Sequence, residues 1–178
     1  MRDESSGSLA DGTRPATPEE LFQRLRELGI DYETAHHPPV FTVEEAQSVR
    51  AEMIGGHTKN LFLRNKKGRM WLLVCDEERR LDLKALGKQL EAGHFSFGSP
   101  ERLMEYLGVI PGAVSPFAVI NDKEGQVRLV LERSLLEVSE LNFHPLDNSM
   151  TTRIATPDLI RFLEEVDHAP ELVDLTRK

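Results

Sequence analysis

The fold is decided by one stretch, His57-Thr-Lys-Asn-Leu-Phe-Leu-Arg-Asn-Lys-Lys-Gly-Arg-Met-Trp-Leu-Leu-Val-Cys75. Two apolar runs flank a polar turn that contains Gly68, which is the pattern of two paired strands joined by a short loop. The stretch contains no acidic residue and five basic ones: Lys59, Arg64, Lys66, Lys67 and Arg69. In a chain of net charge −8, this hairpin is a local positive site.

The composition is that of one globular domain. The chain has 178 residues, of which 39% are hydrophobic and 29% charged, enough for a single sizeable core. We expect a flexible tail over residues 1–16 and one domain over residues 17–178. An acidic balance argues against an extended basic surface that binds nucleic acid without regard to sequence. No apolar run approaches the roughly 18–20 residues of a membrane span, and we expect a cytoplasmic protein.

Capping signals and hydrophobic periodicity predict the other elements. Thr17-Pro18 with Glu20 begins the first helix and Gly29 ends it, while Thr156-Pro157 is expected to cap the last one. A second hairpin is expected around Asp122–Gly125. Helices are predicted near 18–28, 42–49, 81–90, 100–107 and 159–166, and strands near 30–35, 57–63, 70–75, 94–97, 117–121, 127–131 and 150–154; residues 135–141 fit either element. This order indicates an α+β fold, a mixed and mostly antiparallel twisted sheet or open barrel flanked by helices.

Several chemistries lack their sequence patterns. His36 and His37 are adjacent and precede two prolines, and no histidine or cysteine pair has the spacing of a metal site. Cys75 is the single cysteine and lies in an apolar strand, where a buried, inert thiol is expected. Neither a Gly-x-Ser-x-Gly elbow nor a phosphate-binding Gly-rich loop occurs. We therefore expect no metal and no cofactor.

Three features remain as candidate chemistry, each with an ordinary alternative. The segment Gly112-Ala-Val-Ser-Pro116 is a stiff loop whose amides can hold an oxyanion, or it is only a connector. Lys59 faces a polyanionic substrate, or it is a surface lysine at a strand end. His144 lies in a polar cluster with Asn148, or it is a solvated loop histidine.

Four stretches together resemble the YbaK/ProX family, the free-standing relatives of the editing domain inserted in bacterial prolyl-tRNA synthetase. They are His37-Pro-Pro-Val-Phe-Thr-Val-Glu-Glu-Ala46, His57-Thr-Lys-Asn-Leu-Phe-Leu63, Gly112-Ala-Val-Ser-Pro-Phe117 and Asn142-Phe-His-Pro145. The resemblance extends from about residue 17 to residue 167. It implies a compact α/β fold and an enzyme that deacylates mischarged aminoacyl-tRNA in trans. The third and fourth stretches are most similar to the Ala-tRNA(Pro) deacylases.

The resemblance also implies a site. The family's essential lysine falls on Lys59, and its Gly-x-x-x-Pro loop falls on Gly112 and Pro116. In the mechanism we expect, amides of this loop, Ala113 and Val114 among them, stabilise the developing oxyanion. Lys59 binds the terminal phosphate or ribose, and a ribose hydroxyl of the substrate relays the proton.

Other residues complete the expected substrate site. Asn60, Ser115, Pro116 and Asn148 join the binding residues, and His144 orients the water or shapes the pocket. Steric exclusion of proline by a second pocket would set the specificity. Its expected walls are Val40, Phe41, Val114 and His144. The turn residues Arg64, Lys66, Lys67 and Arg69 are expected to contact the acceptor stem of the mischarged tRNA, although solvated charges are the alternative. Prolyl-tRNA synthetase is a second candidate partner.

Two other functions fit the same residues. A non-catalytic tRNA-binding module would use the basic hairpin without hydrolysing the ester, and a regulatory domain would keep the fold without activity. A deacylase for another small amino acid, such as cysteine or serine, is a further alternative.

Overall fold

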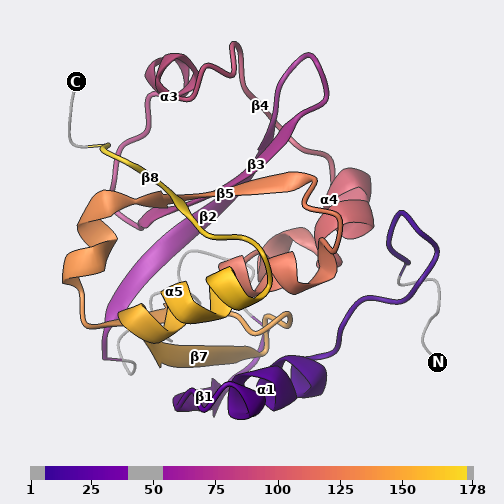
Figure 1. The fold of residues 1–178 in the computed structure, drawn as a ribbon, viewed down its shortest axis with the longest axis vertical. Helices are drawn as coiled ribbons and strands as arrows, with labels where there is room; N and C mark the ends of the chain where they lie inside the picture. The colour runs from indigo at the N-terminus through magenta and orange to yellow at the C-terminus, as the bar shows by residue number, and fades with distance from the viewer. Residues whose placement is uncertain (1–6, 40–53, 176–178) are drawn as a thin grey trace.

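The computed structural model describes residues 7–39 and 54–175, and its centre is a twisted sheet of eight strands (Figure 1). The strands are β1 (Tyr32–His36), β2 (Gly56–Arg64), β3 (Met70–Asp76), β4 (Ser96–Phe97), β5 (Val127–Glu132), β6 (Glu140–Phe143), β7 (Met150–Ala155) and β8 (Glu171–Val173). The described helical segments are α1 (Pro18–Glu27), α3 (Leu83–Gln89), α4 (Pro100–Leu107), α5 (Thr156–Glu165) and the 3-10 segments η2 (Pro111–Ala113), η3 (Pro116–Asn121) and η4 (Arg133–Glu137).

The strand order is β1-β7-β6-β2-β3-β5-β8, and β4 is attached to β2. Four of these pairs are antiparallel, namely β1/β7, β6/β7, β2/β3 and β2/β4. The pairs β2/β6, β3/β5 and β5/β8 are parallel. Because β1 and β8 lie at opposite ends of this order, the described sheet is open. The predicted α+β class, with a mixed sheet flanked by helices, is confirmed.

The predicted hairpin over residues 57–75 is also confirmed. β2 and β3 pair from Thr58 opposite Asp76 to Arg64 opposite Met70. Figure 1 shows β2 as a long diagonal strand through the sheet. Along such a strand, successive side chains point to opposite faces, so this hairpin supplies residues to both sides of the molecule.

The other edge of β2 is only partly paired. β6 pairs with it at residues 56–57, and β4 pairs with it at residues 63–64. The Gly98 amide donates to the Phe62 carbonyl at 2.9 Å. Within the described part of the chain, residues 58–61 therefore have no strand partner on this edge. We call these four residues the open edge of β2.

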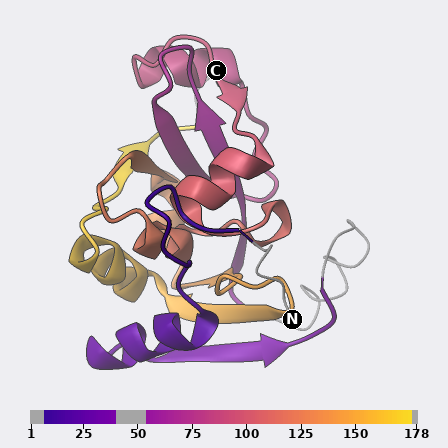
Figure 2. The ribbon, with the colours of Figure 1, turned by 90° about the vertical axis from the view of Figure 1, so that its right-hand side faces the viewer.

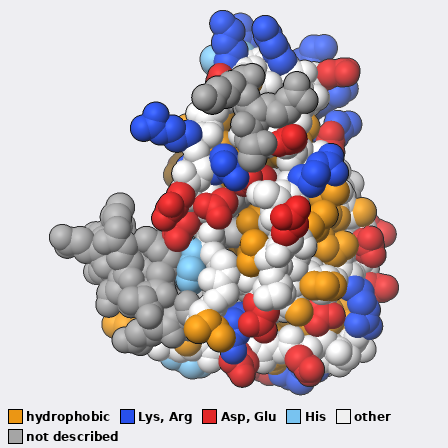
Figure 3. Space-filling model, turned by 90° about the vertical axis from the view of Figure 1, so that its left-hand side faces the viewer, with side chains coloured by type: hydrophobic (Ala, Val, Ile, Leu, Met, Phe, Trp, Pro, Cys, Tyr) orange, Lys and Arg blue, Asp and Glu red, His pale blue; other side chains and the backbone are white. Residues whose placement is uncertain are grey.

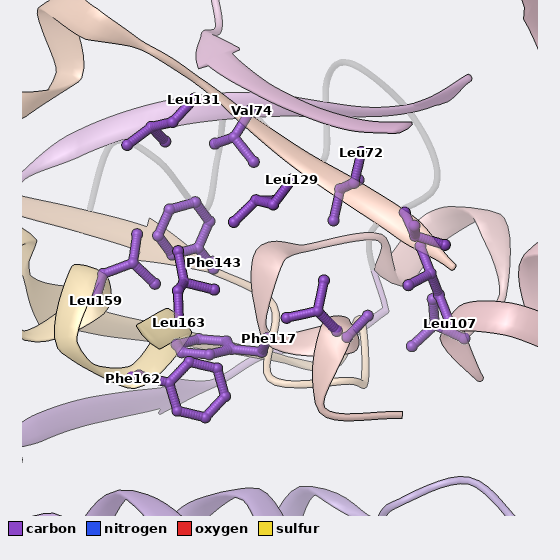
Figure 4. Packing of buried hydrophobic residues seen from close by; sticks show 14 of the residues in the cluster. Leu72, Val74, Leu107, Phe117, Leu129, Leu131, Phe143, Leu159, Phe162 and Leu163 are labelled. Carbon is purple, nitrogen blue, oxygen red and sulfur yellow. The ribbon is translucent and has the colours of Figure 1, made fainter. Parts of the chain in front are cut away.

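Two apolar clusters lie on the two faces of the β2–β3 hairpin. The larger one gathers Phe62 and Leu72 from the hairpin with Phe117, Phe143 and side chains of α5 (Figure 4). The smaller one places Leu63 and Trp71 under Leu86 of α3. Phe62 and Leu63 are neighbours in sequence and enter different clusters, as strand alternation requires.

The first helix, α1, begins as the capping rules predict, whereas the last helix, α5, does not. The Thr17 hydroxyl and the Glu20 carboxylate form a capping box on α1, as predicted. The prediction that Thr156 caps the last helix is wrong, because Ala155 is the N-cap residue and Thr156 lies in the first turn. The Thr156 hydroxyl instead donates to the Val138 carbonyl, which holds the chain between η4 and β6 against α5.

The predicted second hairpin is wrong as well. Residues 116–121 form the 3-10 segment η3, which begins with Pro116 and whose N-cap Ser115 accepts from the Phe117 amide at 3.2 Å. β5 then runs parallel to β3, with Leu72 opposite Leu129. The turn at residues 122–125 therefore connects η3 to β5 rather than two paired strands.

The expected tail over residues 1–16 differs from the structure in its described part, residues 7–16. The Leu9 side chain is buried, and the Ala10 amide donates to the Glu105 carbonyl of α4 at 2.8 Å. Further along, the Ala16 amide donates to Asn121 Oδ1 at 2.8 Å. Figure 2 shows this segment passing in front of the helices of the middle of the chain. Residues 7–16 thus pack on the domain.

The other predicted elements agree with the structure except at their ends, whereas β8 was not predicted. The helix predicted over 81–90 spans 83–89, because the Asp82 side chain caps it by accepting from the Ala85 amide. The strand predicted over 94–97 is limited to β4, and residues 135–141 divide between η4 and β6. The helix predicted near 42–49 lies outside the described residues. Among the described helices, none has both the length and the apolar character required to cross a membrane.

Candidate functional site

Lys59 lies on β2 directly opposite Cys75 of β3. It lies on the same face of the sheet as Leu61 and Leu63. Leu63 belongs to the smaller cluster under α3, and Leu61 packs against that cluster. The lysine is half-buried, and no hydrogen bond or ion pair joins it to another described residue. A free ammonium group on a sheet face is available to bind an anion.

Cys75 is not available as a nucleophile. The thiol is fully buried in the smaller cluster. Burial raises its pKa to about 12, although the nearby Lys59 charge acts in the opposite direction. Because the thiolate is the reactive form of cysteine, this side chain stays inert at neutral pH.

Asn60, the next residue of β2, faces the opposite side of the sheet. By alternation it shares the face of Phe62, which packs in the larger cluster. Its side-chain nitrogen donates to Thr58 Oγ1 at 3.3 Å, but its Oδ1 is buried and has no partner among the described residues. A buried carbonyl oxygen without a donor is costly, so this atom is ready to accept a hydrogen bond from a bound molecule.

The Gly112–Pro116 loop lies on the same side as Asn60. Ala113 is buried in the larger cluster and Val114 packs against it. The Ala113 amide already donates to the Ile110 carbonyl at 2.9 Å within the turn of η2. Amides on the carboxyl side of this turn, at Val114 and Ser115, are therefore better placed to hold an oxyanion than the Ala113 amide.

His144 lies just beyond the end of β6. It follows Phe143, whose ring meets the Phe117 ring edge-on with centroids 5.8 Å apart. His144 Nδ1 is 2.8 Å from the Met150 carbonyl. A carbonyl can only accept, so this nitrogen carries the proton. Burial lowers the pKa of His144, and the neutral ring therefore keeps Nε2 as an acceptor.

Two asparagines surround this region, and only one of them was predicted. Asn148 is 7% exposed, and its side-chain nitrogen has no partner among the described residues. Asn142, which was missed as a site residue, donates to the Ile54 and Gly56 carbonyls at 2.8 and 3.1 Å. It fixes the start of β2 on β6. Its place in the Asn-Phe-His-Pro stretch was the signal available in the sequence.

The basic turn of the hairpin is exposed to solvent, and the Asn65 side chain orders it by accepting from the Lys67 and Arg69 amides. Lys66, Lys67 and Arg69 are exposed. Arg64 is half-buried, with Nε lacking a partner in the described structure. In Figure 3, Lys and Arg side chains gather at the upper end of the molecule, where Figure 1 shows this turn and α3. This charge fits a phosphate backbone.

The predicted site residues thus form two groups. Asn60 and the Gly112–Pro116 loop lie on the side of the larger cluster, whereas Lys59 lies on the α3 side. His144 contacts the start of β7. No hydrogen bond or ion pair among the described residues joins Lys59 to the loop. The two sides meet at the open edge of β2. Val40 and Phe41, the other expected pocket walls, lie outside the described residues.

A metal site is absent from the part of the chain that the structure describes. No group of three or more His, Cys, Asp or Glu side chains there could hold an ion. His37, which the sequence placed before two prolines, lies 6.1 Å from His144 between ring centroids and its Nε2 is 2.8 Å from Thr151 Oγ1. These contacts tie the histidines to β7.

Comparison with solved structures supports the fold. A protein described as a candidate trans-editing enzyme for prolyl tRNA synthetase superposes with a TM-score of 0.68 over 92% of this chain and 99% of that chain, at 20% identity. A second structure, of the hypothetical protein APE2540, gives a TM-score of 0.69 over 87% of this chain and 97% of that chain, at 17% identity. At such identities the likeness concerns the fold alone.

Sequence comparison is more specific. The prolyl-tRNA editing protein ProX of Acetoanaerobium sticklandii is 36% identical over 156 residues, covering 87% of this chain and 95% of the relative. The prolyl-tRNA synthetase associated domain-containing protein 1 of Danio rerio is 38% identical over 156 residues, covering 86% and 85%. The multifunctional Ser/Thr-tRNA deacylase ProXp-y of Escherichia coli (strain K12) is 26% identical, covering 82% and 92%. Residues 37–162 match the model of the aminoacyl-tRNA editing domain. The chain therefore belongs to the aminoacyl-tRNA editing domain family.

Proposed function

We propose that this chain hydrolyses the ester of tRNA(Pro) mischarged with alanine, acting in trans to prolyl-tRNA synthetase. Family membership makes the chain an aminoacyl-tRNA deacylase. One observation carries the choice of tRNA, the similarity to a prolyl-tRNA editing protein along nearly the whole of both chains. The choice of alanine rests on the Gly112–Phe117 and Asn142–Pro145 stretches.

In this proposal the ester lies across the open edge of β2. The amides of Val114 and Ser115 receive the carbonyl oxygen as it becomes negative, and each such donor is worth about 10²–10³-fold in rate. Gly112 and Pro116 shape the loop, and Ala113 anchors it to the core. An aminoacyl ester is already activated, so positioning and charge stabilisation are enough for hydrolysis.

Lys59 approaches the same edge from the α3 side and binds the phosphate or ribose of the terminal adenosine. Asn60 stands on the other side, and its unsatisfied Oδ1 accepts a hydrogen bond from a ribose hydroxyl or the substrate amino group. Two neighbouring residues on opposite faces thus hold one substrate at the strand edge. In this arrangement both of the adjacent polar residues contact the substrate.

His144 serves binding rather than proton abstraction. Its lowered pKa makes it a weak base at neutral pH, while its Nε2 can accept from the attacking water or the amino group. The free ribose hydroxyl of the substrate then relays the proton. His144, Val114 and Asn148 line the small pocket that admits alanine and excludes proline. Such a second pocket is needed because the synthetase's own proline pocket rejects the smaller alanine by only about 1–3 kcal/mol.

The experiment compares Ala-tRNA(Pro) with Pro-tRNA(Pro) as substrates. We expect the wild type to deacylate the first and spare the second. The Lys59→Ala variant should lose about 10²-fold or more in kcat/KM, because misplacing the ester is this costly. Lys123→Ala, which removes an exposed lysine at a distant turn, is the matched control. Equal loss of both charged tRNAs, or full activity of Lys59→Ala, would refute the assignment.

A second amino acid belongs in the same assay. The Escherichia coli relative is named for serine and threonine, and serine differs from alanine by one hydroxyl. A pocket that is mainly apolar cannot strongly reject such an isostere. Ser-tRNA(Pro) and Cys-tRNA(Pro) turned over faster than Ala-tRNA(Pro) would move the proposal to those substrates, while tRNA binding without turnover would indicate a non-catalytic module.

A further inference from the structure

Phe97 is a large aromatic side chain left in solvent beside the basic hairpin. It is 62% exposed, although the neighbouring Phe95 is buried against Trp71. It lies on β4, a two-residue strand at the free edge of β2, opposite Leu63. An exposed phenyl ring on a short edge strand contributes little to the core and is available for recognition.

Basic residues surround the same end of the molecule. The hairpin turn contributes Lys66, Lys67 and Arg69, and α3 contributes Lys84 and Lys88. Only Glu91 opposes them within residues 65–69 and 83–95, so these segments carry a formal charge of +4 in a chain of net charge −8. Figure 3 shows this accumulation at the upper end of the molecule.

The turn and the end of α3 form one rigid surface. Asn65 Nδ2 donates to the Ala92 carbonyl at 2.9 Å, and Asn65 Oδ1 accepts from the Lys67 and Arg69 amides. A groove of about 750 Å³ lies along α3 and the segment after it, lined by the apolar Leu83 and Phe95 and by the charged Lys84, Lys88 and Glu91. Cations and an aromatic platform held on one frame are the elements of a single-strand binding surface.

The spacing along β2 relates this surface to the proposed ester site. Phe97 lies opposite Leu63, four residues beyond Lys59, or roughly 13 Å at the rise of a strand. That distance matches about four stacked nucleotides at roughly 3.4 Å each, the length of the unpaired 3′ end of a tRNA. The basic turn lies beyond it, where the paired stem would begin.

We propose that Phe97 is a stacking platform for the unpaired 3′ nucleotides, and that Lys66, Lys67, Arg69, Lys84 and Lys88 hold the backbone of the adjoining acceptor stem. This inference rests on the proposed deacylase function and names how its substrate is held. The occupant is RNA rather than an acidic protein segment, because the aromatic platform lies roughly 13 Å from Lys59, the length of about four stacked nucleotides. The surface binds the tRNA and takes no part in the chemistry.

The test compares two substrates of one enzyme, Ala-tRNA(Pro) and an alanyl ester of adenosine that lacks the rest of the tRNA. Phe97→Ala should raise KM for the tRNA about 10-fold, since stacking on an aromatic ring is worth that much per base, and Phe97→Tyr should restore it. Leu136→Ala, at another exposed apolar side chain, is the control. Neither Phe97 variant should change hydrolysis of the small ester.

A charge variant tests the second half of the surface. Lys67→Glu should weaken tRNA binding and reduce the slope of log affinity against log salt by about one, whereas Lys123→Glu, at a similar turn, should do neither. If both Phe97 and Lys67 variants match their controls on the tRNA, the surface is not used and this inference fails. If the wild type hydrolyses neither substrate, the proposed function fails instead. Binding of a polyglutamate peptide in competition with tRNA would assign the surface to a protein partner.

Discussion

Two turns of this molecule are built alike and held in different ways. In the turn after β2, the buried Asn65 accepts from the Lys67 and Arg69 amides and donates to the Ala92 carbonyl. In the turn before β5, the buried Asp122 accepts from the Gln126 and Val127 amides at 2.9 and 2.7 Å. The neutral Asn65 side chain fixes the basic turn through hydrogen bonds alone, whereas the Asp122 carboxylate is also paired with a cation.

That cation is His168, from the chain beyond α5. Its Nε2 lies 2.9 Å from Asp122 Oδ2, and its Nδ1 lies 2.8 Å from the Val166 carbonyl. Both partners can only accept, so both ring nitrogens carry protons and the ring is an imidazolium. Burial alone would lower its pKa, but the hydrogen bonds to Asp122 and Val166 raise it. We therefore expect the stability of the Asp122 turn to depend on pH and that of the Asn65 turn not to.

Removing the charged Asp122 side chain should have the largest effect on the free energy of unfolding. Asp122→Ala leaves a buried imidazolium and two amides without acceptors. We expect a loss of about 3–5 kcal/mol in the free energy of unfolding, the range for breaking a buried ion pair, measured by urea denaturation. An effect below that of Asn65→Ala would show that the ion pair does not stabilise the turn.

Changing pH should remove part of the same free energy without a change at Asp122. The folded pKa of His168 is raised above its unfolded value of 6.5. Its stabilisation is therefore fully present below pH 6.5 and is lost as the pH rises through the folded pKa. The difference in unfolding free energy between wild type and His168→Gln should shrink over this interval, which cancels contributions from other groups such as His144. A constant difference from pH 5 to 9 would contradict the imidazolium.

Replacing the neutral Asn65 side chain should have the smallest effect on stability, and this effect should not change with pH. Asn65→Ala removes three hydrogen bonds and leaves a buried carbonyl and two amides, at a cost of about 1–3 kcal/mol. The cost should be the same at pH 6 and pH 8, as measured by urea denaturation at both values. A cost that changed with pH would mean that the basic turn is coupled to a titrating group.

The two turns also show what could be predicted from the sequence. Asn65-Lys-Lys-Gly68 and Asp122-Lys-Glu-Gly125 look alike, and both were predicted to close hairpins. The first lies between alternating strands that pair locally. The second follows Pro116 and the Ser115 cap, which turn an apolar run into a 3-10 segment, and β5 finds its partner β3 far back in the chain. A local sequence pattern predicts pairing between strands that are neighbours in the chain, but not pairing between strands that are far apart in it.

The candidate site divides in the same way. Strand alternation alone places Lys59 and Asn60 on opposite faces. Which face the Gly112–Pro116 loop would join depends on long-range packing of Ala113 and Phe117 in the larger cluster. The engagement of the Ala113 amide in η2 and the unsatisfied Oδ1 of Asn60 are three-dimensional facts. The motif identifies the candidate residues, and packing determines their surroundings.

Trp71 gives this molecule an intrinsic optical probe. It is the single tryptophan of the chain, and it is buried beneath α3, with only 2% of its surface exposed. Its ring meets the Phe95 ring edge-on, with the two centroids 5.0 Å apart. Phe95 belongs to the groove beside the basic turn, and Phe97 is two residues away. Fluorescence from this one indole therefore reports on the α3 end of the domain without a label, and titration with RNA can be followed by emission from the unmodified protein.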